Sequence, residues 1–145
     1  AEDLKNSLAS RGVKSIAIKD LDNNLLEKRQ GPTIVVGTWD QLKQLDWLDK
    51  FNKAYKKTGT NVYFSDKGVE LLDYCGNTGQ TVKNAGIITA AGNGLGDRNP
   101  LWLVCGTEQT GLQMAVDLLA NSPQKISGYY GVAVVAGKVQ RLPLQ

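Results

Sequence analysis

The sequence predicts an α/β domain: a mixed, largely parallel sheet flanked by helices, with a C-terminal antiparallel hairpin. Short apolar, β-branched runs alternate along the chain with segments of helical periodicity, a pattern typical of strand–helix units. The chain has 145 residues, of which 41% are hydrophobic, enough for one core. No internal repeat, low-complexity tract or linker interrupts it, so we expect residues 1–145 to form a single domain.

The first quarter of the chain predicts a helix, a strand and then loops. Residues 2–11 place Leu4 and Leu8 on one helical face, and residues 15–19 alternate like a half-buried strand. Asp and Asn residues between 20 and 24 indicate a turn. The polar residues 24–32 are expected to form a loop.

A strand and a long helix are predicted next. The apolar run 33–37 is typical of a fully buried central strand. Thr38 suits the N-cap of the helix that follows, and Gly59 its end. Its apolar stripe consists of Leu45, Leu48, Phe51 and Tyr55.

The middle of the chain predicts two strands separated by a short helix. Residues 62–64 read as a strand, and Ser65 or Asp66 can cap a helix that contains Val69 and Leu72. The segment 76–79 should end that helix. A strand is expected at 87–91, and a glycine-rich loop then runs to Pro100.

The last third gives the clearest pattern. Residues 101–105 are the strongest strand signal, and Gly106-Thr107 turns this strand into a helix that ends at 121–123. The apolar face of that helix follows the i, i+3, i+4, i+7 spacing, with Leu112, Ala115, Val116 and Leu119. Residues 130–136 and 139–142 predict a hairpin with its turn at Gly137-Lys138.

The composition argues against catalytic chemistry. The chain has no histidine, which removes the commonest general base and the commonest metal ligand. Cys75 and Cys105 lie thirty positions apart without a histidine partner, so neither a Cys–His dyad nor a Cys/His zinc site can form. We therefore expect no catalytic residue, metal or cofactor. The two cysteines either form a disulfide or are buried thiols, and the apolar surroundings of Cys105 favour the buried thiol.

Charge and hydropathy restrict the partners. The net charge is +3 and the basic residues are scattered, whereas a nucleic-acid surface needs a clustered basic stripe. No stretch approaches the roughly 20 apolar residues that span a bilayer. Residues 1–3 open directly into a polar segment, as expected of a chain without a signal peptide or of one from which the signal has been removed. We expect no nucleic-acid partner and no membrane span.

Two glycine-rich segments have some features of phosphate-binding loops. Gly92-x-Gly94-x-Gly96 leads into a predicted strand rather than a helix, so we interpret it as a connection. Gly106 and Gly111 have the P-loop spacing, but Leu112-Gln113 stands where Lys and Ser/Thr are required. That segment is expected to start a helix, with Thr107 as its cap and Glu108 complementing the dipole.

The pattern Asp20-x-Asp22-x-Asn24 is the opening of a calcium loop. The sixth and twelfth positions hold Leu25 and Gly31, where an EF-hand needs Gly and Glu. A tight turn is the interpretation that this pattern favours.

Two kinds of ligand site stay open as alternatives. A small molecule or nucleotide would bind at the strand ends Gly37-Thr38 and Gly106-Thr107, where open α/β sheets place ligands. A carbohydrate would stack on Trp39 and Tyr129, the aromatic residues expected to be most exposed, beside the 92–98 loop.

Two segments together resemble a known pattern. The first is the apolar strand and glycine of residues 33–38; the second is Asn-Pro, an apolar strand and Gly-Thr in residues 99–107, followed by a helix with Gly111-x3-Ala115. This order resembles the small α/β domains of archaeal and bacterial surface-layer proteins. It is also similar to accessory domains of glycoside hydrolases and of the periplasmic subunit of bacterial cellulose synthase.

The resemblance implies a non-catalytic structural or interaction domain, cut from a larger exported protein of the cell envelope or the extracellular space. Its partners would be neighbouring domains of the parent chain or other envelope proteins, with glycans as a further class. A carbohydrate-binding accessory module and a small-molecule-binding or nucleotide-binding domain are the two alternatives.

Overall fold

The computed structural model describes residues 22–27, 33–55, 60–91, 101–122, 124 and 131–144. The helix predicted at 2–11, the strand at 15–19 and the loop at 92–100 lie outside the described residues. So do Gly59, Asp20 and Tyr129.

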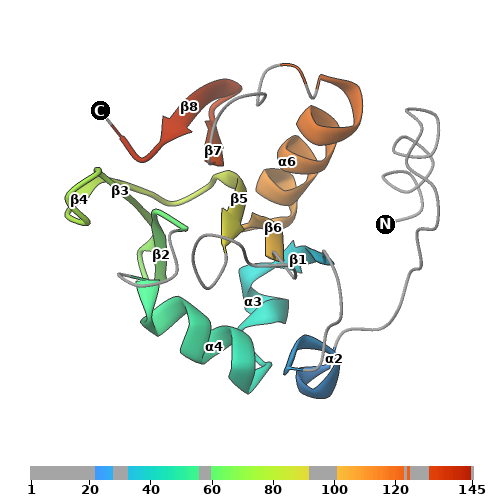
Figure 1. Ribbon diagram of the computed structural model, residues 1–145. Coiled ribbons are helices and arrows are strands. Elements are labelled where there is room, and N and C mark those ends of the chain that lie inside the picture. Colours follow the sequence, from blue (N-terminus) through green and yellow to red (C-terminus); the bar gives the residue numbers. More distant parts are fainter. Residues whose placement is uncertain are drawn as a thin grey trace.

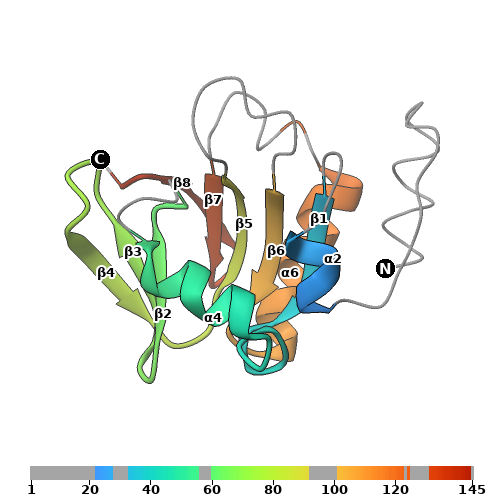
Figure 2. The ribbon, with the colours of Figure 1, turned by 60° about the horizontal axis from the view of Figure 1, so that its bottom comes forward.

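The described strands form two sheets (Figures 1 and 2). The five-stranded sheet has the order β1-β6-β5-β7-β8, with the bounds Thr33–Thr38, Leu101–Gly106, Gly86–Ala91, Gly131–Val135 and Lys138–Leu142. The three-stranded sheet has the order β2-β3-β4, with the bounds Val62–Ser65, Gly68–Leu72 and Thr78–Val82.

The predicted fold class is wrong, because the sheets are mostly antiparallel rather than largely parallel. Of the six strand pairings that the structure describes, β1 with β6 is parallel and the other five are antiparallel. The prediction inferred parallel pairing from the overall alternation of strands with helices. Instead β5 pairs directly with β6 as an antiparallel neighbour, and residues 62–82 form a meander.

The prediction of a helix that begins at Ser65 or Asp66 is also wrong, because this segment forms the β2–β3 turn and strand β3. Gly68 adopts φ +117° in the β2–β3 turn, and a Cβ there would overlap the Val82 carbonyl oxygen. In β3 Val69 and Leu71 are fully buried while Glu70 is half-buried, which is strand periodicity. The helical interpretation relied on two apolar residues three positions apart, Val69 and Leu72. Both are buried in strand β3, so this spacing does not distinguish a helix from a strand.

β1 is a strand as predicted, but it is not a central, fully buried one. It ends the described five-stranded sheet, and the side chain of Ile34 is 42% exposed. A β-branched apolar run shows that a strand forms, and it does not show how many neighbours the strand has.

The long helix predicted after Thr38 is divided into α3 (Trp39–Leu42) and α4 (Asp46–Lys53). Leu45 is extended at the N-cap of α4 instead of being helical. A further short helix, α2 (Asn23–Glu27), spans the end of the predicted turn at 20–24 and the start of the predicted loop at 24–32. The Trp47 N–H donates a 3.0 Å hydrogen bond to Asn23 Oδ1, which ties α2 to α4.

The helix α6 (Gln109–Asn121) confirms the predicted amphipathic segment and covers one face of the five-stranded sheet. Leu112 and Ala115 are buried as expected, Val116 and Leu119 are half-buried, and Leu118 is buried in addition. Together with Ile88, Val104 and Val132 they form the smaller of two core clusters.

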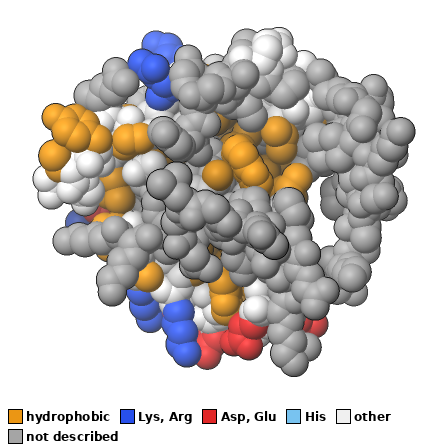
Figure 3. Space-filling view, in the orientation of Figure 1, with side chains coloured by type: hydrophobic (Ala, Val, Ile, Leu, Met, Phe, Trp, Pro, Cys, Tyr) orange, Lys and Arg blue, Asp and Glu red, His pale blue; other side chains and the backbone are white. Residues whose placement is uncertain are grey.

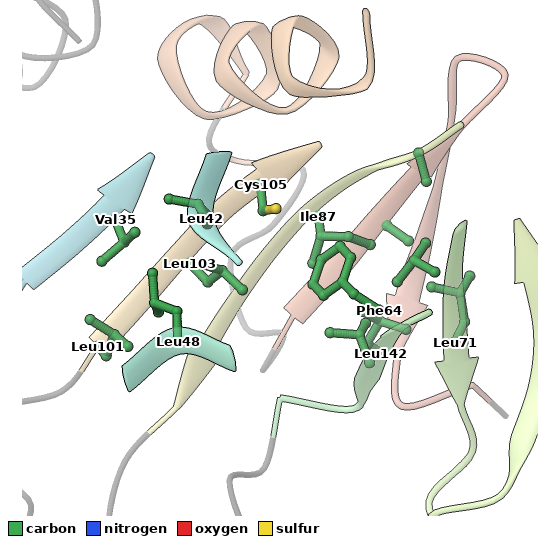
Figure 4. Packing of buried hydrophobic residues seen from close by; sticks show 14 of the residues in the cluster. Val35, Leu42, Leu48, Phe64, Leu71, Ile87, Leu101, Leu103, Cys105 and Leu142 are labelled. Carbon is green, nitrogen blue, oxygen red and sulfur yellow. The ribbon is translucent and has the colours of Figure 1, made fainter. Parts of the chain in front are cut away.

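The opposite face of the five-stranded sheet is covered by α3, α4 and the three-stranded sheet. In Figure 2, α4 crosses in front of the strands and α6 lies behind them. Figure 4 shows the larger core cluster, which joins side chains from both sheets, among them Leu103, Phe64 and Leu71.

The C-terminal hairpin is confirmed, with its turn one residue earlier than predicted. Ala136 (φ 51°) and Gly137 (φ 80°) occupy the two turn positions, as a tight two-residue hairpin requires.

After β8 the chain crosses to the three-stranded sheet. The Leu144 N–H donates a 2.8 Å hydrogen bond to the Leu72 carbonyl, and Leu144 forms a parallel bridge with Asp73. Its side chain packs against the larger core cluster. The strand that ends one sheet therefore continues into a contact with the other.

None of the helices in the described part of the chain is long and apolar enough to cross a membrane.

Candidate functional site at the ends of β1 and β6

The parallel pairing of β1 with β6 brings the two predicted strand-end segments together. Thr38 is the register partner of Gly106, and Gly37 is the partner of Cys105. The helix that follows β1 packs on one face of the sheet, and the helix that follows β6 packs on the other. This is the arrangement in which open α/β sheets form a ligand crevice.

The two glycines at this corner lie in close contact with the chain that follows each strand. A Cβ on Gly106 would overlap the Leu112 nitrogen and lie 2.6 Å from the Glu108 carbonyl oxygen. A Cβ on Gly37 would lie 3.0 Å from Leu42 Cδ2. The two glycines therefore permit close packing of the chain where a phosphate-binding loop would leave room for its ligand.

The start of α6 is fixed to the start of β5 by equally close contacts. A Cβ on Gly111 would overlap the Ala85 carbonyl oxygen, and one on Gly86 would overlap the Gly111 carbonyl oxygen. Gly86 also faces Ala115, whose Cβ would lie 3.0 Å from a Cβ at that position. Gly111 and Ala115 thus form the surface on which α6 meets the sheet.

Thr107 does not cap α6, contrary to the prediction, because Glu108 is the N-cap residue. Thr107 is instead joined to Ala85 by two hydrogen bonds. Its N–H donates to the Ala85 carbonyl at 3.1 Å, and its Oγ1 accepts from the Ala85 N–H at 3.0 Å. The polar groups of Thr107 thus hold the end of β6 to the beginning of β5.

Thr38 and Trp39 are likewise engaged within the fold. Thr38 is the N-cap residue of α3 as predicted, it is buried, and its N–H donates to Gln41 Oε1 at 3.3 Å. The ring of Trp39 stacks on Phe64 with centroids 4.7 Å apart and 16° between the planes. One face of Trp39 is therefore used by the core, and Tyr129, its predicted partner in sugar stacking, lies outside the described residues.

A small pocket lies between α4, β2 and the five-stranded sheet, next to Trp39. Its volume suits about one water molecule. Its walls are largely apolar, and the polar side chains in them, Asn52 and Thr60, already form hydrogen bonds with backbone groups. The lining residues are Trp39, Leu48, Phe51, Asn52, Thr60, Val62, Phe64 and Leu103.

The two cysteines are both free thiols in very different surroundings. Cys105 is fully buried, as predicted, and burial raises the pKa of its thiol far above the ordinary value. Cys75 is exposed in the β3–β4 turn, where its N–H donates to Asp73 Oδ1 at 2.8 Å. Among the described residues no three His, Cys, Asp or Glu side chains are grouped so as to hold a metal ion.

Two lysines on the α3–α4 surface are paired with acids. Lys43 Nζ lies 3.1 Å from Asp40 Oδ1, and Lys53 Nζ lies 3.0 Å from Asp49 Oδ2. Figure 3 shows basic and acidic side chains next to one another at the lower edge of the molecule. Acidic and basic side chains are mixed on this surface.

Sequence reasoning missed a surface feature, the free edge of β4. Thr78, Gly79, Gln80 and Thr81 are all exposed, whereas no other described strand has four consecutive exposed residues. The sequence did contain a signal: Thr78–Val82 includes three β-branched residues, but its neighbouring glycines were interpreted as a helix break.

No protein-family model matches the sequence, and the comparison with curated proteins finds no significant relative.

Proposed function

We propose that this chain is a non-catalytic structural or interaction domain of an exported cell-envelope protein of the surface-layer type. The observation that carries the proposal is the packing at the ends of β1 and β6. There Gly106 lies so close to Leu112 that it packs the end of β6 against the start of α6, at the position where an α/β ligand site would need room.

The resemblance described above supports the proposal at the level of single residues. Gly106, Gly111 and Ala115 belong to the pattern that resembles surface-layer domains, and each lies in a close contact between α6 and the sheet. Their role is to build a rigid scaffold. A scaffold of this kind suits a protein whose task is to pack against its neighbours.

The surface offers a route for such packing. The β2 edge of the three-stranded sheet is covered by α4, whereas the β4 edge is exposed. An exposed strand edge can pair with another chain through main-chain hydrogen bonds. The domain thus combines close packing at the β1–β6 strand ends with an exposed strand edge at β4, features that suit an interaction module.

Localisation tests the envelope part of the proposal. Cells of the source organism are fractionated, and the protein is detected with antibodies raised against this domain. We expect the signal in the envelope or extracellular fraction, as part of a longer chain. A signal confined to the cytosol would overturn the proposal.

Ligand binding tests the non-catalytic part. Thermal unfolding is measured with nucleotides, sugar phosphates and a glycan panel. Binding at a hundredfold excess over Kd would add about 2.7 kcal/mol of stability. We expect no shift in Tm. A shift that the Thr38→Val variant abolishes would instead establish a binding site at the β1–β6 corner.

A further inference from the structure

The strand β1 is covered on one side of the five-stranded sheet and partly exposed on the other. On the α4 side, Val35 is 2% exposed and belongs to the larger core cluster, together with Leu26 of α2. On the α6 side, Ile34 is 42% exposed, and Val36 and Trp102 are half-buried. Trp102 is the register partner of Ile34, so these three side chains form one apolar patch at the end of the sheet. Such a patch favours a covering contact.

The backbone of β1 also has one side without a described strand. β1 pairs with β6, and no other strand in the described part of the chain pairs with it. In a parallel ladder the backbone groups of successive residues point to opposite sides. Between Ile34 and Thr38, therefore, every second residue directs its N–H and carbonyl groups away from β6. A row of this kind is a template on which a further strand can pair.

A segment of the same chain has the sequence of such a strand. Residues 15–19, which lie outside the described residues, alternate in the way that predicts a half-buried strand. Ile16 and Ile18 would share one face of it, and Ala17 would lie on the other. The isoleucine face matches the apolar patch beside β1. The small side chain of Ala17 needs little room on the side that α2 and α4 already cover.

The chain also holds this segment close to β1. The helix α2 is fixed at the β1 end of the molecule, on the α4 side of the sheet (Figures 1 and 2), where Leu26 is fully buried. Residues 20 and 21 alone separate Lys19 from Asp22, so the Cα atoms of those two residues lie at most about 11 Å apart. A strand tethered this closely has a higher effective concentration at β1 than a free chain, which makes it the favoured occupant.

We propose that residues 15–19 are the strand that covers β1: they pair with its outer edge and place Ile16 and Ile18 on the side of Ile34. The described five-stranded sheet then gains a sixth strand. Residues 20–32 connect the two strands and are long enough for pairing in either direction. The pairing goes beyond the proposed function and does not depend on where the protein is located in the cell.

Amide exchange of the intact chain, measured residue by residue by NMR, tests whether β1 has a second neighbour. A strand between two neighbours has all its amides bonded, whereas a strand at a sheet edge leaves every second amide open to solvent. We expect all four amides of residues 34–37 to exchange at least about a hundredfold more slowly than those of an unstructured chain. Fast exchange at alternate residues of β1 would overturn the proposal.

Nuclear Overhauser contacts identify the neighbour. We expect contacts between the backbone protons of residues 16–18 and those of residues 34–37. Samples that mix labelled and unlabelled chains distinguish contacts within one chain from contacts between copies. Protection of β1 without contacts to residues 16–18, or with contacts between two copies alone, would assign the edge to another occupant and overturn the proposal.

A double-mutant cycle tests the side-chain contact. The variant Ile16→Ala/Ile18→Ala and the variant Ile34→Ala are measured by urea unfolding, separately and combined. Because these side chains share one contact, the combined loss in the folding equilibrium constant should be about fivefold smaller than the product of the separate losses. Val139→Ala is the matched control, since Val139 is 37% exposed and lies in β8, the strand at the other end of the sheet. Its loss should multiply with that of Ile16→Ala/Ile18→Ala to within about twofold.

Multiplicative losses with Ile34→Ala as well as with Val139→Ala would contradict the contact. Where the variant Ile16→Ala/Ile18→Ala does not fold, the amide exchange and the Overhauser contacts of the native chain decide between the outcomes.

Discussion

The side chain of Asn52 pairs with the backbone of Phe64 through two hydrogen bonds, each 2.9 Å long. Its Nδ2 donates to the Phe64 carbonyl, and its Oδ1 accepts from the Phe64 N–H. An amide carries a donor and an acceptor side by side, as a strand residue does. Asn52 thus replaces the missing neighbour of β2 and closes that edge of the three-stranded sheet.

Replacing Asn52 with leucine should destabilise the protein by about 2–4 kcal/mol, because two buried backbone groups lose their partners. Asn52→Asp is the matched control. Its carboxylate can still accept from the Phe64 N–H and cannot donate to the carbonyl, so it should retain one of the two bonds. Urea unfolding measures both free energies. A loss below about 1 kcal/mol for the leucine variant would contradict this role of the amide.

Gly106 should tolerate no side chain. In Gly106→Ala the new Cβ overlaps the Leu112 nitrogen, so the start of α6 must move, and we expect a loss of about 3 kcal/mol. Gly76→Ala provides the comparison. Its Cβ meets nothing within 4 Å, and the φ of +84° should cost about 1 kcal/mol. Thermal unfolding of Gly106→Ala reports the cost of steric overlap, and that of Gly76→Ala reports the cost of the positive φ. Equal losses of stability in the two variants would argue against close packing at Gly106.

A buried hydroxyl connects β5 to the segment just before β2, and its loss should be measurable. Thr89 Oγ1 donates a 2.9 Å hydrogen bond to the Thr60 carbonyl, and Thr89 is fully buried. Thr89→Val keeps the shape and removes the donor, which should cost about 1–3 kcal/mol. Thr81→Val on the exposed β4 should change stability by less than about 0.5 kcal/mol. Chemical denaturation distinguishes the two, and equal stability of the two variants would contradict the prediction.

The two thiols should react at very different rates. Burial raises the pKa of Cys105, so the thiolate fraction is lower than that of an ordinary cysteine at every pH. We expect a thiol reagent to modify Cys75 quickly in the folded protein, and Cys105 only as fast as the chain opens. Peptide mapping after pulsed labelling measures both rates. Rapid labelling of Cys105 without unfolding would show that the β6 core is accessible.

The elements that could be predicted are those in which local pattern and tertiary context agree. The apolar face of α6 packs against one sheet. The spacing of its apolar residues therefore predicted both the helix and the side of the helix that is buried. The β7–β8 hairpin was predictable because Gly137, which permits φ > 0, lies between the apolar run of β7 and the alternating residues of β8.

The meander of β2, β3 and β4 was not predictable from the local pattern. The burial of Val69 depends on its strand partner Val82, thirteen residues away, and the spacing of apolar residues in β3 fits a helix equally well. The candidate site shows the same limit. The sequence placed glycines at the ends of β1 and β6, and their adjacency was expected from parallel pairing. The close contacts of Gly106 and Gly111 depend on how α6 approaches the sheet, which the local sequence does not show.

The hydrogen bond from Leu144 to Leu72 has a consequence for the way the molecule unfolds. The strand that ends the five-stranded sheet runs directly into a contact with the three-stranded sheet, so separating the sheets also breaks that contact. Opening of either sheet alone is therefore penalised, and the two should lose amide-exchange protection in one cooperative transition. A load applied at the C-terminal side would likewise be shared between both sheets.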